Sequence, residues 1–288
     1  MTAPDRDLQR PTRARWWHVI VRNKLHLATI TAAIGLLALA AFADLIAPYG
    51  ATEVVGFAAE TPTADYLLGT DEIGRDVFSR VIFGSRISLY VGFGATLIAV
   101  AVGVPLGIAS GYFGRLVDTV TMRVTDGLLA FPPIILAMAT VAVLGPNLRN
   151  TIIAIGVVQI PRFARLVRGV TLSLRQSEFV VAARALGGSH FYIMARSLLP
   201  NLVSITTVQF TLTFATAVLT EAALSFLGLG VQPPTPSWGR MLGVGKTLLS
   251  MNPWIAVGSG SAIFVTVLVF TLLGDTLSDV LNPYRKKR

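Results

Sequence analysis

The sequence contains no cysteine among its 288 residues. This absence excludes disulfide bonds, thiolate metal sites and a cysteine nucleophile, and it leaves the redox compartment of the protein open. The three histidines, at positions 18, 26 and 190, are too scattered for a metal site, and no region combines Ser, His and Asp. We therefore predict a chain that is not an enzyme and that itself binds no cofactor or metal.

Charged residues are scarce, and long uncharged runs take their place. They make up 14% of the chain, against about 25% in a typical soluble domain. A sixth uncharged run, 150–161, is long enough for a membrane span only if it continues through Arg162, Arg165 and Arg168, whose long side chains can reach the membrane surface. Five other runs without Asp, Glu, Lys or Arg reach the roughly 18 residues typical of a transmembrane helix: 25–43, 87–114, 127–148, 197–220 and 247–274.

These runs predict an all-α polytopic membrane protein whose single membrane domain occupies residues 27–282. Leu25–Ala43 is too long for the apolar part of a signal peptide and continues to Asp44 and Pro48, so we expect an uncleaved helix. An external loop, 48–86, follows it. The six transmembrane helices are placed roughly at 27–47, 87–110, 122–144, 150–170, 201–222 and 253–275.

The basic residues predict the orientation of the chain in the membrane. With six spans both termini lie on one side, and that side carries 18 of the 24 Lys and Arg residues, which makes it cytoplasmic by the positive-inside rule. It holds the N-terminal tail 1–26, where Trp16 and Trp17 mark an interfacial segment, the loop 173–200 and the basic tail 283–288. The net charge of +9 is therefore a topology signal, aided by anionic membrane lipid, and does not indicate nucleic-acid binding.

The segment "SEFVVAARALGG", residues 177–188, predicts a short helix in the basic loop. Ser177 is expected to cap its first turn, and the glycine pair at 187–188 is expected to end it. A second helix, capped by Ser189, is expected to stop at Pro200 before the fifth span.

Small residues flatten one surface of the first of these helices. Ala182, Ala183 and Gly187 expose little side chain, so another backbone can approach closely. The residues alone leave two interpretations open: a docking surface for another protein, or a loop helix packed on its own bundle.

The pattern "AARALGGS…LLPN" resembles the EAA loop of the inner-membrane permease subunits of binding-protein-dependent ABC importers. The chain departs from that pattern at Val181, where the family has Glu, and Glu178 one helical turn earlier is the candidate substitute. "LLGTDEIGRDVFSRVIFGSRISL" (67–89), "EAALSFLGLGVQPPTPSWGRML" (221–242) and "GDTLSDVLNP" are similar to the C-type permease of the dipeptide/oligopeptide/nickel branch. The positions that match the EAA pattern are Ala182, Ala183, Gly187, Leu199 and Pro200.

The resemblance implies a type I ABC importer permease fold in a bacterial inner membrane. It implies a second homologous permease that shares the translocation pathway, two cytoplasmic ATPases that hold ATP and Mg²⁺ and grip the EAA loop, and an extracytoplasmic solute-binding protein. The implied cargo is di- or oligopeptides, with nickel or another small solute as the alternative. An ion-coupled secondary transporter would need paired charges at the midplane, which the uncharged spans lack. A membrane enzyme would need His or carboxylates clustered around one cavity.

The external side holds further candidate residues. Asp71, Arg75 and Asp76 lie in a loop with the charge and turn chemistry to contact the solute-binding protein; the alternative is a solvated loop packed on its own bundle. Glu221 lies about 30 Å along a helix from Asn201, near the external interface, where a cap or gate contact competes with a transport role.

Three further patterns receive structural interpretations. "GVGKT" (243–247) resembles the end of a phosphate-binding P-loop, but the required first glycine is replaced by Arg240, so we expect an external loop entering the sixth span. Arg123 and Asp126 have the spacing of an ion pair on one helix face. Topology and contacts with lipid phosphate suffice for Arg162, Arg165 and Arg168.

Overall fold

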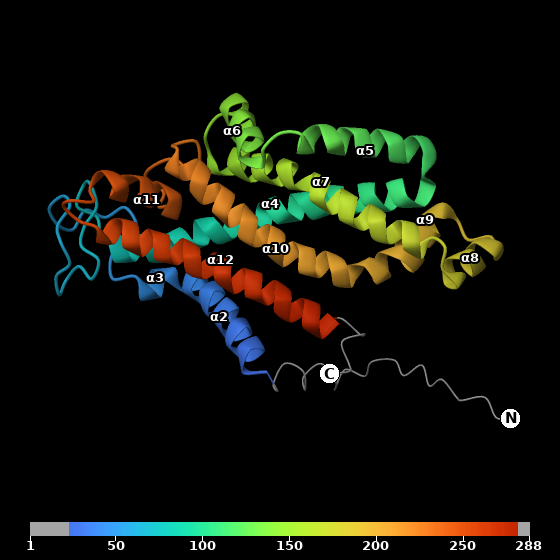
Figure 1. Ribbon diagram of the computed structural model, residues 1–288. Helices are drawn as coiled ribbons and strands as arrows, with labels where there is room; N and C mark the ends of the chain where they lie inside the picture. Colours follow the sequence, from blue (N-terminus) through green and yellow to red (C-terminus); the bar gives the residue numbers. More distant parts are fainter. Residues whose placement is uncertain (1–22, 282–288) are drawn as a thin grey trace.

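The structure, a computed structural model, describes residues 23–281, which form a bundle of helices (Figure 1). The predicted tails 1–26 and 283–288 therefore lie almost wholly outside the described residues, as do Trp16 and Trp17. Within 23–281 the only β pairing is an isolated bridge between Thr70 and Asp76. The helices are α2 (Lys24–Ala41), α3 (Ala43–Ile46), α4 (Val77–Phe113), α5 (Arg115–Leu129), α6 (Pro133–Leu144), α7 (Leu148–Leu174), α8 (Glu178–Ala185), α9 (His190–Tyr192), the π-helix η1 (Ile193–Leu198), α10 (Leu199–Phe226), α11 (Trp238–Thr247) and α12 (Trp254–Leu281).

Five helical stretches are long and apolar enough to cross a membrane, and a sixth span is possible if α5 and α6 count as one. The predicted third span, 122–144, is therefore not a single helix, because α5 and α6 meet at an angle of 91°. Pro132 and Pro133 lie at this break. Pro132 disfavours helical backbone in Phe131 and neither proline has an amide hydrogen, so the helix ends before them and restarts at Pro133.

Helices α4 and α7 pack closely along their length because glycine faces the contact. An added Cβ at Gly103, Gly107 or Gly111 would lie within 3 Å of atoms of α7, among them the carbonyl oxygens of Ile160 and Ala164. Small residues spaced four apart let membrane helices approach in this way. This four-residue spacing of glycine is visible in the sequence at positions 103, 107 and 111.

Helices α10, α12 and α2 complete the bundle around α4. The rings of Phe214 on α10 and Phe270 on α12 stack with centroids 3.8 Å apart, and Phe93 of α4 packs against both. Apart from the segments on either side of α6, the connecting segments gather at two opposite ends (Figure 1). We call these the loop end, which holds residues 47–76 and α11, and the α8 end, which holds α8 and α9.

Candidate functional site

The segment predicted as a short helix forms α8, and its C-terminus ends as the sequence indicates. Gly187 has a φ of +79°, which a glycine adopts without strain. The amides of Gly188 and Gly187 donate to the carbonyls of Ala183 and Arg184, both at 3.0 Å. This paired arrangement satisfies carbonyls at the helix end and fixes the direction in which the chain leaves α8.

The capping predictions have different outcomes. Ser189 caps α9, since its Oγ accepts a hydrogen bond of 3.2 Å from the amide of Tyr192. The prediction for Ser177 is wrong: its hydroxyl instead donates to the carbonyl of Leu174, three residues earlier. The N-terminus of α8 therefore has no side-chain cap, and Glu178 in its first turn is the remaining favourable group there.

A single buried side chain anchors α8 to the bundle. Val180 is completely buried in an apolar cluster that includes Tyr112 of α4, Phe163 of α7 and Ile193 of η1. Ala183, one turn later, is half-buried against the same cluster. The helix therefore sits on three different elements with one face, and the opposite face is free.

The free side of α8 and its C-terminal turn carry three of the six predicted coupling residues. Glu178, Ala182 and Gly187 are exposed, and no atom lies within 4 Å of where a Gly187 Cβ would be. The same segment exposes large apolar side chains, with Leu186 88% and Phe191 78% exposed. We define the coupling surface as the exposed residues Glu178, Phe179, Val181, Ala182, Leu186, Gly187, Phe191 and Tyr192.

Val181, the position at which the family pattern has Glu, is also exposed. Glu178 lies three residues earlier, so both side chains occupy neighbouring positions on one face of α8. Glu178 therefore offers an acidic group on the same surface, one turn from position 181, and stays the candidate substitute.

The predicted stop at Pro200 is wrong. Helical backbone continues from His190 to Phe226, and Leu199 and Pro200 lie in the first turn of α10, both exposed. The preceding six residues, Ile193–Leu198, form the wider π-helix η1. Pro200 has no amide hydrogen and cannot donate to the preceding turn. The wider turn of the π-helix before it accommodates this missing hydrogen bond, so the helix continues through Pro200 without a break.

Tyr112, near the end of α4, connects that helix to the loop that carries α8. Its phenolic oxygen lies 2.9 Å from Nδ1 of His190, and the guanidinium of Arg184 lies 5.6 Å from its ring centroid. Arg175 Nη1 donates to its backbone carbonyl at 3.1 Å. No sequence signal singled out Tyr112, because its partners lie more than 60 residues away.

At the loop end, the structure places Asp71, Arg75 and Asp76 inside the loop instead of on its surface. The Asp71 carboxylate accepts a 2.6 Å hydrogen bond from Arg75 Nε and lies 3.3 Å from Arg80 Nε. Asp76 caps α4 by accepting from the amide of Ser79 at 2.7 Å. All three predicted contact residues are buried, so in this chain they shape the loop.

The same loop exposes several large apolar side chains beside charged ones such as Glu53 and Asp65. Phe57 is 82% exposed, and Val54, Leu67 and Ile73 are also exposed. The loop is fastened by Asn252, whose fully buried side chain lies before α12. Asn252 Nδ2 donates to the carbonyls of Glu60, Leu68 and Thr70 at 2.9–3.1 Å.

Glu221 is completely buried near the loop end of α10. Its Oε1 accepts hydrogen bonds from Ser225 at 2.7 Å and from Ser237, just before α11, at 2.9 Å. Ser225 in turn accepts from the amide of Val231 at 3.2 Å. The carboxylate therefore joins α10 to the loop 227–237, which is the cap contact among the predicted alternatives.

The α5–α7 contact carries two ion pairs. Asp126 pairs with Arg165 at 2.6 Å, so the predicted partner Arg123 is wrong. Asp118 pairs with Arg168. Arg165 and Arg168, which were expected to serve topology and contact lipid phosphate, thus hold α5 against α7. Their partners are within reach because α5 folds back onto the bundle.

The "GVGKT" segment is helical and forms the second half of α11. Trp238 holds α11 against α4 by donating from Nε1 to the carbonyl of Val81 at 2.8 Å. A phosphate-binding loop needs free backbone amides before a helix, and here the residues lie inside one. Among residues 23–281, no group of three His, Asp or Glu side chains could hold a metal ion.

The sequence profile of the family described as "binding-protein-dependent transport system inner membrane component" matches residues 103–287. The chain belongs to this family. The match covers α5 to α12 and includes α8 with its coupling surface. The protein is therefore a multi-pass membrane protein, and its spans are those of a transport permease.

Individual relatives extend the match over nearly the whole permease. This chain is 42% identical over 266 residues to the dipeptide transport system permease protein DppC of Alkalihalophilus pseudofirmus. The alignment covers 92% of this chain and 88% of the relative. The chain is 44% identical over 283 residues to the glutathione transport system permease protein GsiD of Escherichia coli O1:K1, covering 96% and 93%. GsiD of Pectobacterium atrosepticum is 39% identical, covering 98% and 94%.

A solved structure confirms the fold. The permease superposes on a chain of the inward-facing MetNI methionine ABC transporter with a TM-score of 0.58, at 19% sequence identity. The superposition covers 70% of this chain and 96% of that chain. The predicted type I ABC permease fold is thus confirmed.

Proposed function

We propose that the protein is a membrane subunit of an ATP-driven peptide importer and that its coupling surface docks on a cytoplasmic ATPase. The exposed apolar cluster at the α8 end carries this proposal. Leu186, Phe191 and Tyr192 project from a segment rigidly anchored through Val180, where a soluble loop would expose polar residues. Large exposed apolar patches mark protein interaction sites.

In the proposed orientation the α8 end and both termini are cytoplasmic. The excess of Lys and Arg in 1–26, 162–200 and 283–288 supports this arrangement. The loop end then faces outward, and the apolar residues Val54, Phe57 and Ile73 are the proposed contacts of a solute-binding protein.

The proposed cargo is a di- or oligopeptide. Support comes from the names of the relatives, which are permeases of dipeptide and glutathione transport systems. A second homologous permease completes the pathway in this proposal, and ATP and Mg²⁺ are held by two ATPase partners. Nickel or another small solute is the alternative cargo within the same machinery.

The test is purification of the tagged chain from its own membrane, followed by reconstitution in liposomes. We expect a second permease and ATPase subunits to co-purify. Uptake of a labelled dipeptide should require both ATP and the solute-binding protein. Uptake driven by an ion gradient without ATP would contradict the proposed mechanism, and uptake of nickel but not of dipeptides would contradict the proposed cargo.

A further inference from the structure

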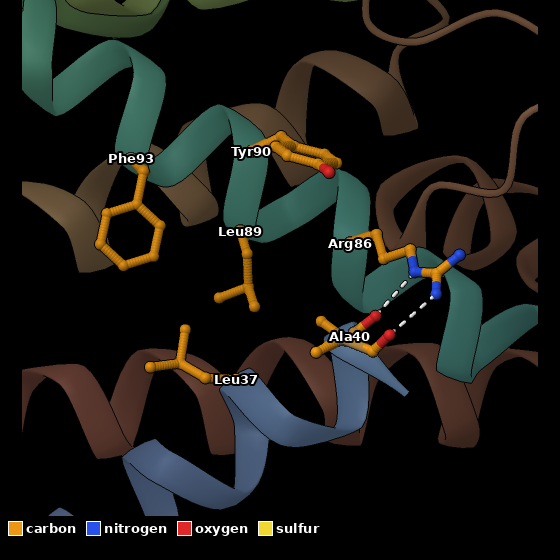
Figure 2. A pocket seen from close by; sticks show the side chains of 7 residues that line it. Leu37, Ala40, Arg86, Leu89, Tyr90 and Phe93 are labelled. Atoms are coloured by element: carbon orange, nitrogen blue, oxygen red, sulfur yellow. Dashed lines mark hydrogen bonds between the residues drawn. The ribbon is translucent and has the colours of Figure 1, made fainter. Parts of the chain in front are cut away.

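An open groove of about 350 Å³ lies between α2 and α4 on the side of the bundle (Figure 2). Its walls are apolar except at one end, where Arg86 reaches across from α4 to the last turn of α2. The lining residues are Leu37, Ala40, Ala41, Arg86, Leu89, Tyr90 and Phe93.

Arg86, at one end of this groove, forms an ion pair with Asp44, which lies outside the residues that line it. Arg86 Nε donates to the carbonyl of Ala40 at 2.6 Å, and Nη2 donates to Ala41 at 3.1 Å and to Asp44 Oδ2 at 2.7 Å. Figure 2 shows the guanidinium turned toward these two carbonyls. Within residues 23–281, Arg86 Nη1 and Asp44 Oδ1 form no hydrogen bond with the side chain or backbone of another residue.

This ion pair lies at the level of lipid headgroups. Helix α2 has 18 residues and is therefore about 27 Å long, close to the roughly 30 Å of the hydrocarbon layer. Arg86 binds the carbonyls of its last residues, at one edge of that layer. Leu37 and Phe93 lie roughly 6 Å and 10 Å further along their helices, so the groove runs from the headgroups into the hydrocarbon.

We propose that this groove binds a phospholipid with a primary-amine headgroup, such as a phosphatidylethanolamine. The phosphate accepts hydrogen bonds from Arg86 Nη1, and the ammonium donates to Asp44 Oδ1. An acyl chain lies along Leu37, Leu89 and Phe93. Tyr90, which is exposed beside the groove, has the position of an interfacial aromatic residue.

The neutral ion pair selects this headgroup over the other common ones. A purely anionic headgroup would be attracted by the guanidinium but repelled by the unpaired carboxylate oxygen of Asp44. A quaternary choline has no N–H to donate, so it offers that oxygen no hydrogen bond and leaves it to water, since the Asp44 side chain is 72% exposed. Of these headgroups, the zwitterion with a primary amine uses the free site on both residues.

A second groove on the same chain serves as a matched control. It lies between α10 and α12, has a volume of about 380 Å³ and contains no charged side chain. Leu268 in this groove is 42% exposed, as is Leu37 in the first. The control groove is lined by Leu219, Gly260, Ile263, Phe264, Val267, Leu268 and Thr271.

The experiment places the assembled transporter in nanodiscs with equal amounts of phosphatidylethanolamine, phosphatidylcholine and phosphatidylglycerol. Lipids retained after mild detergent release are counted by native mass spectrometry. We expect the wild type to retain the ethanolamine lipid preferentially, and Leu37→Trp to remove this lipid while Leu268→Trp does not. Asp44→Asn should lower the preference over choline lipid about threefold, a typical exposed charge interaction.

Arg86→Gln should reduce retention of every phospholipid, but it also removes bonds to α2, so Asp44→Asn is the decisive variant. Equal retention of ethanolamine and choline lipids by the wild type would overturn the proposal. So would an unchanged preference in Asp44→Asn. If Leu37→Trp instead separates the permease from its partner subunit without loss of lipid, the groove is a protein interface and the proposal fails.

Discussion

The hydroxyl of Tyr112 and Nδ1 of His190 lie 2.9 Å apart, across the boundary between α4 and the segment that carries the coupling surface. Helix α4 makes the most extensive helix contact of the bundle, with α7. A displacement of α9 is therefore passed to the bundle through Tyr112 as well as through the covalent connections to α7 and α10.

Removing this hydroxyl should weaken coupling between ATP hydrolysis and uptake. In Tyr112→Phe the ring still packs but the hydrogen bond to His190 is lost, which costs about 1 kcal/mol. We expect uptake per ATP hydrolysed to fall roughly threefold, measured in proteoliposomes with the purified complex. Tyr66→Phe, which removes a 2.6 Å bond to Val55 at the loop end, is the control. Equal effects of the two variants would contradict the specific role of Tyr112.

A bulky residue at Gly187 should uncouple ATPase activity from uptake while the complex still assembles. Gly187→Trp places a large side chain on the coupling surface, and uptake should fall about tenfold because a misfitted contact costs roughly 1–3 kcal/mol. Gly145→Trp is the control, since it introduces the same backbone strain away from the coupling surface. Gly145 has a φ of +89°, and no atom lies within 4 Å of where its Cβ would be. Full transport by Gly187→Trp would rule out the coupling surface.

The close approach of α4 and α7 should depend on glycine at position 107. An alanine Cβ there would lie 2.7 Å from the carbonyl oxygen of Ala164, so Gly107→Ala should destabilise the fold by about 1–3 kcal/mol. Gly169→Ala on α7 meets no atom within 4 Å and should stabilise the helix by roughly 0.5–1 kcal/mol. Thermal unfolding in detergent would distinguish them, and similar melting temperatures would contradict the packing argument.

Loss of Asn252 should release the loop 47–76 from the bundle. Asn252→Ala leaves three backbone carbonyls without their side-chain donor, at a cost of about 1–3 kcal/mol. Hydrogen exchange should then speed up within 47–76 and remain unchanged in α4. Asn201→Ala, which removes one exposed bond to Ser197, is the control. Unchanged protection of the loop would show that other contacts fasten it.

Substitutions of Glu221 should separate a structural role from a direct role in transport. Glu221→Gln keeps an oxygen for Ser225 and Ser237, so stability and uptake should stay near the wild-type values. Glu221→Ala removes the acceptor for both hydroxyls and should cost about 1–3 kcal/mol. A stable Glu221→Gln protein without uptake would instead assign the charge itself to transport.

A long uncharged run was sufficient to predict α2, α4, α10 and α12, because a run of that length has few other uses. Helix α7 needed a further argument, since its uncharged run 150–161 is short and continues through three arginines. The criterion of uncharged runs missed the break between α5 and α6, since Phe131 and the two prolines carry no charge and lie inside the uncharged run 127–148. The same limit applies at Pro200, where the π-helix before it could not be foreseen and the expected stop was wrong.

Part of the coupling surface was predicted from local pattern, because helix α8 and its terminal glycines depend on neighbours in sequence. Its exposed apolar residues, such as Leu186 and Phe191, were not predicted. The loop end was not predictable in this way. The charges of Asp71 and Arg75 were correctly placed in one loop, but their burial depends on Arg80 and on the distant Asn252. Sequence indicates a charge; its exposure is decided by packing.

The continuous helix from His190 to Phe226 has a mechanical consequence. Its 37 residues form a rod about 55 Å long that begins beside the coupling surface and carries Glu221 near its other end. Because Glu221 accepts a hydrogen bond from Ser237, this helix is attached to the loop 227–237 at the loop end. A rotation of α9 is therefore transmitted along one continuous helix to both faces of the membrane. The wider turn of the π-helix η1 is the section of this helix that deforms most easily.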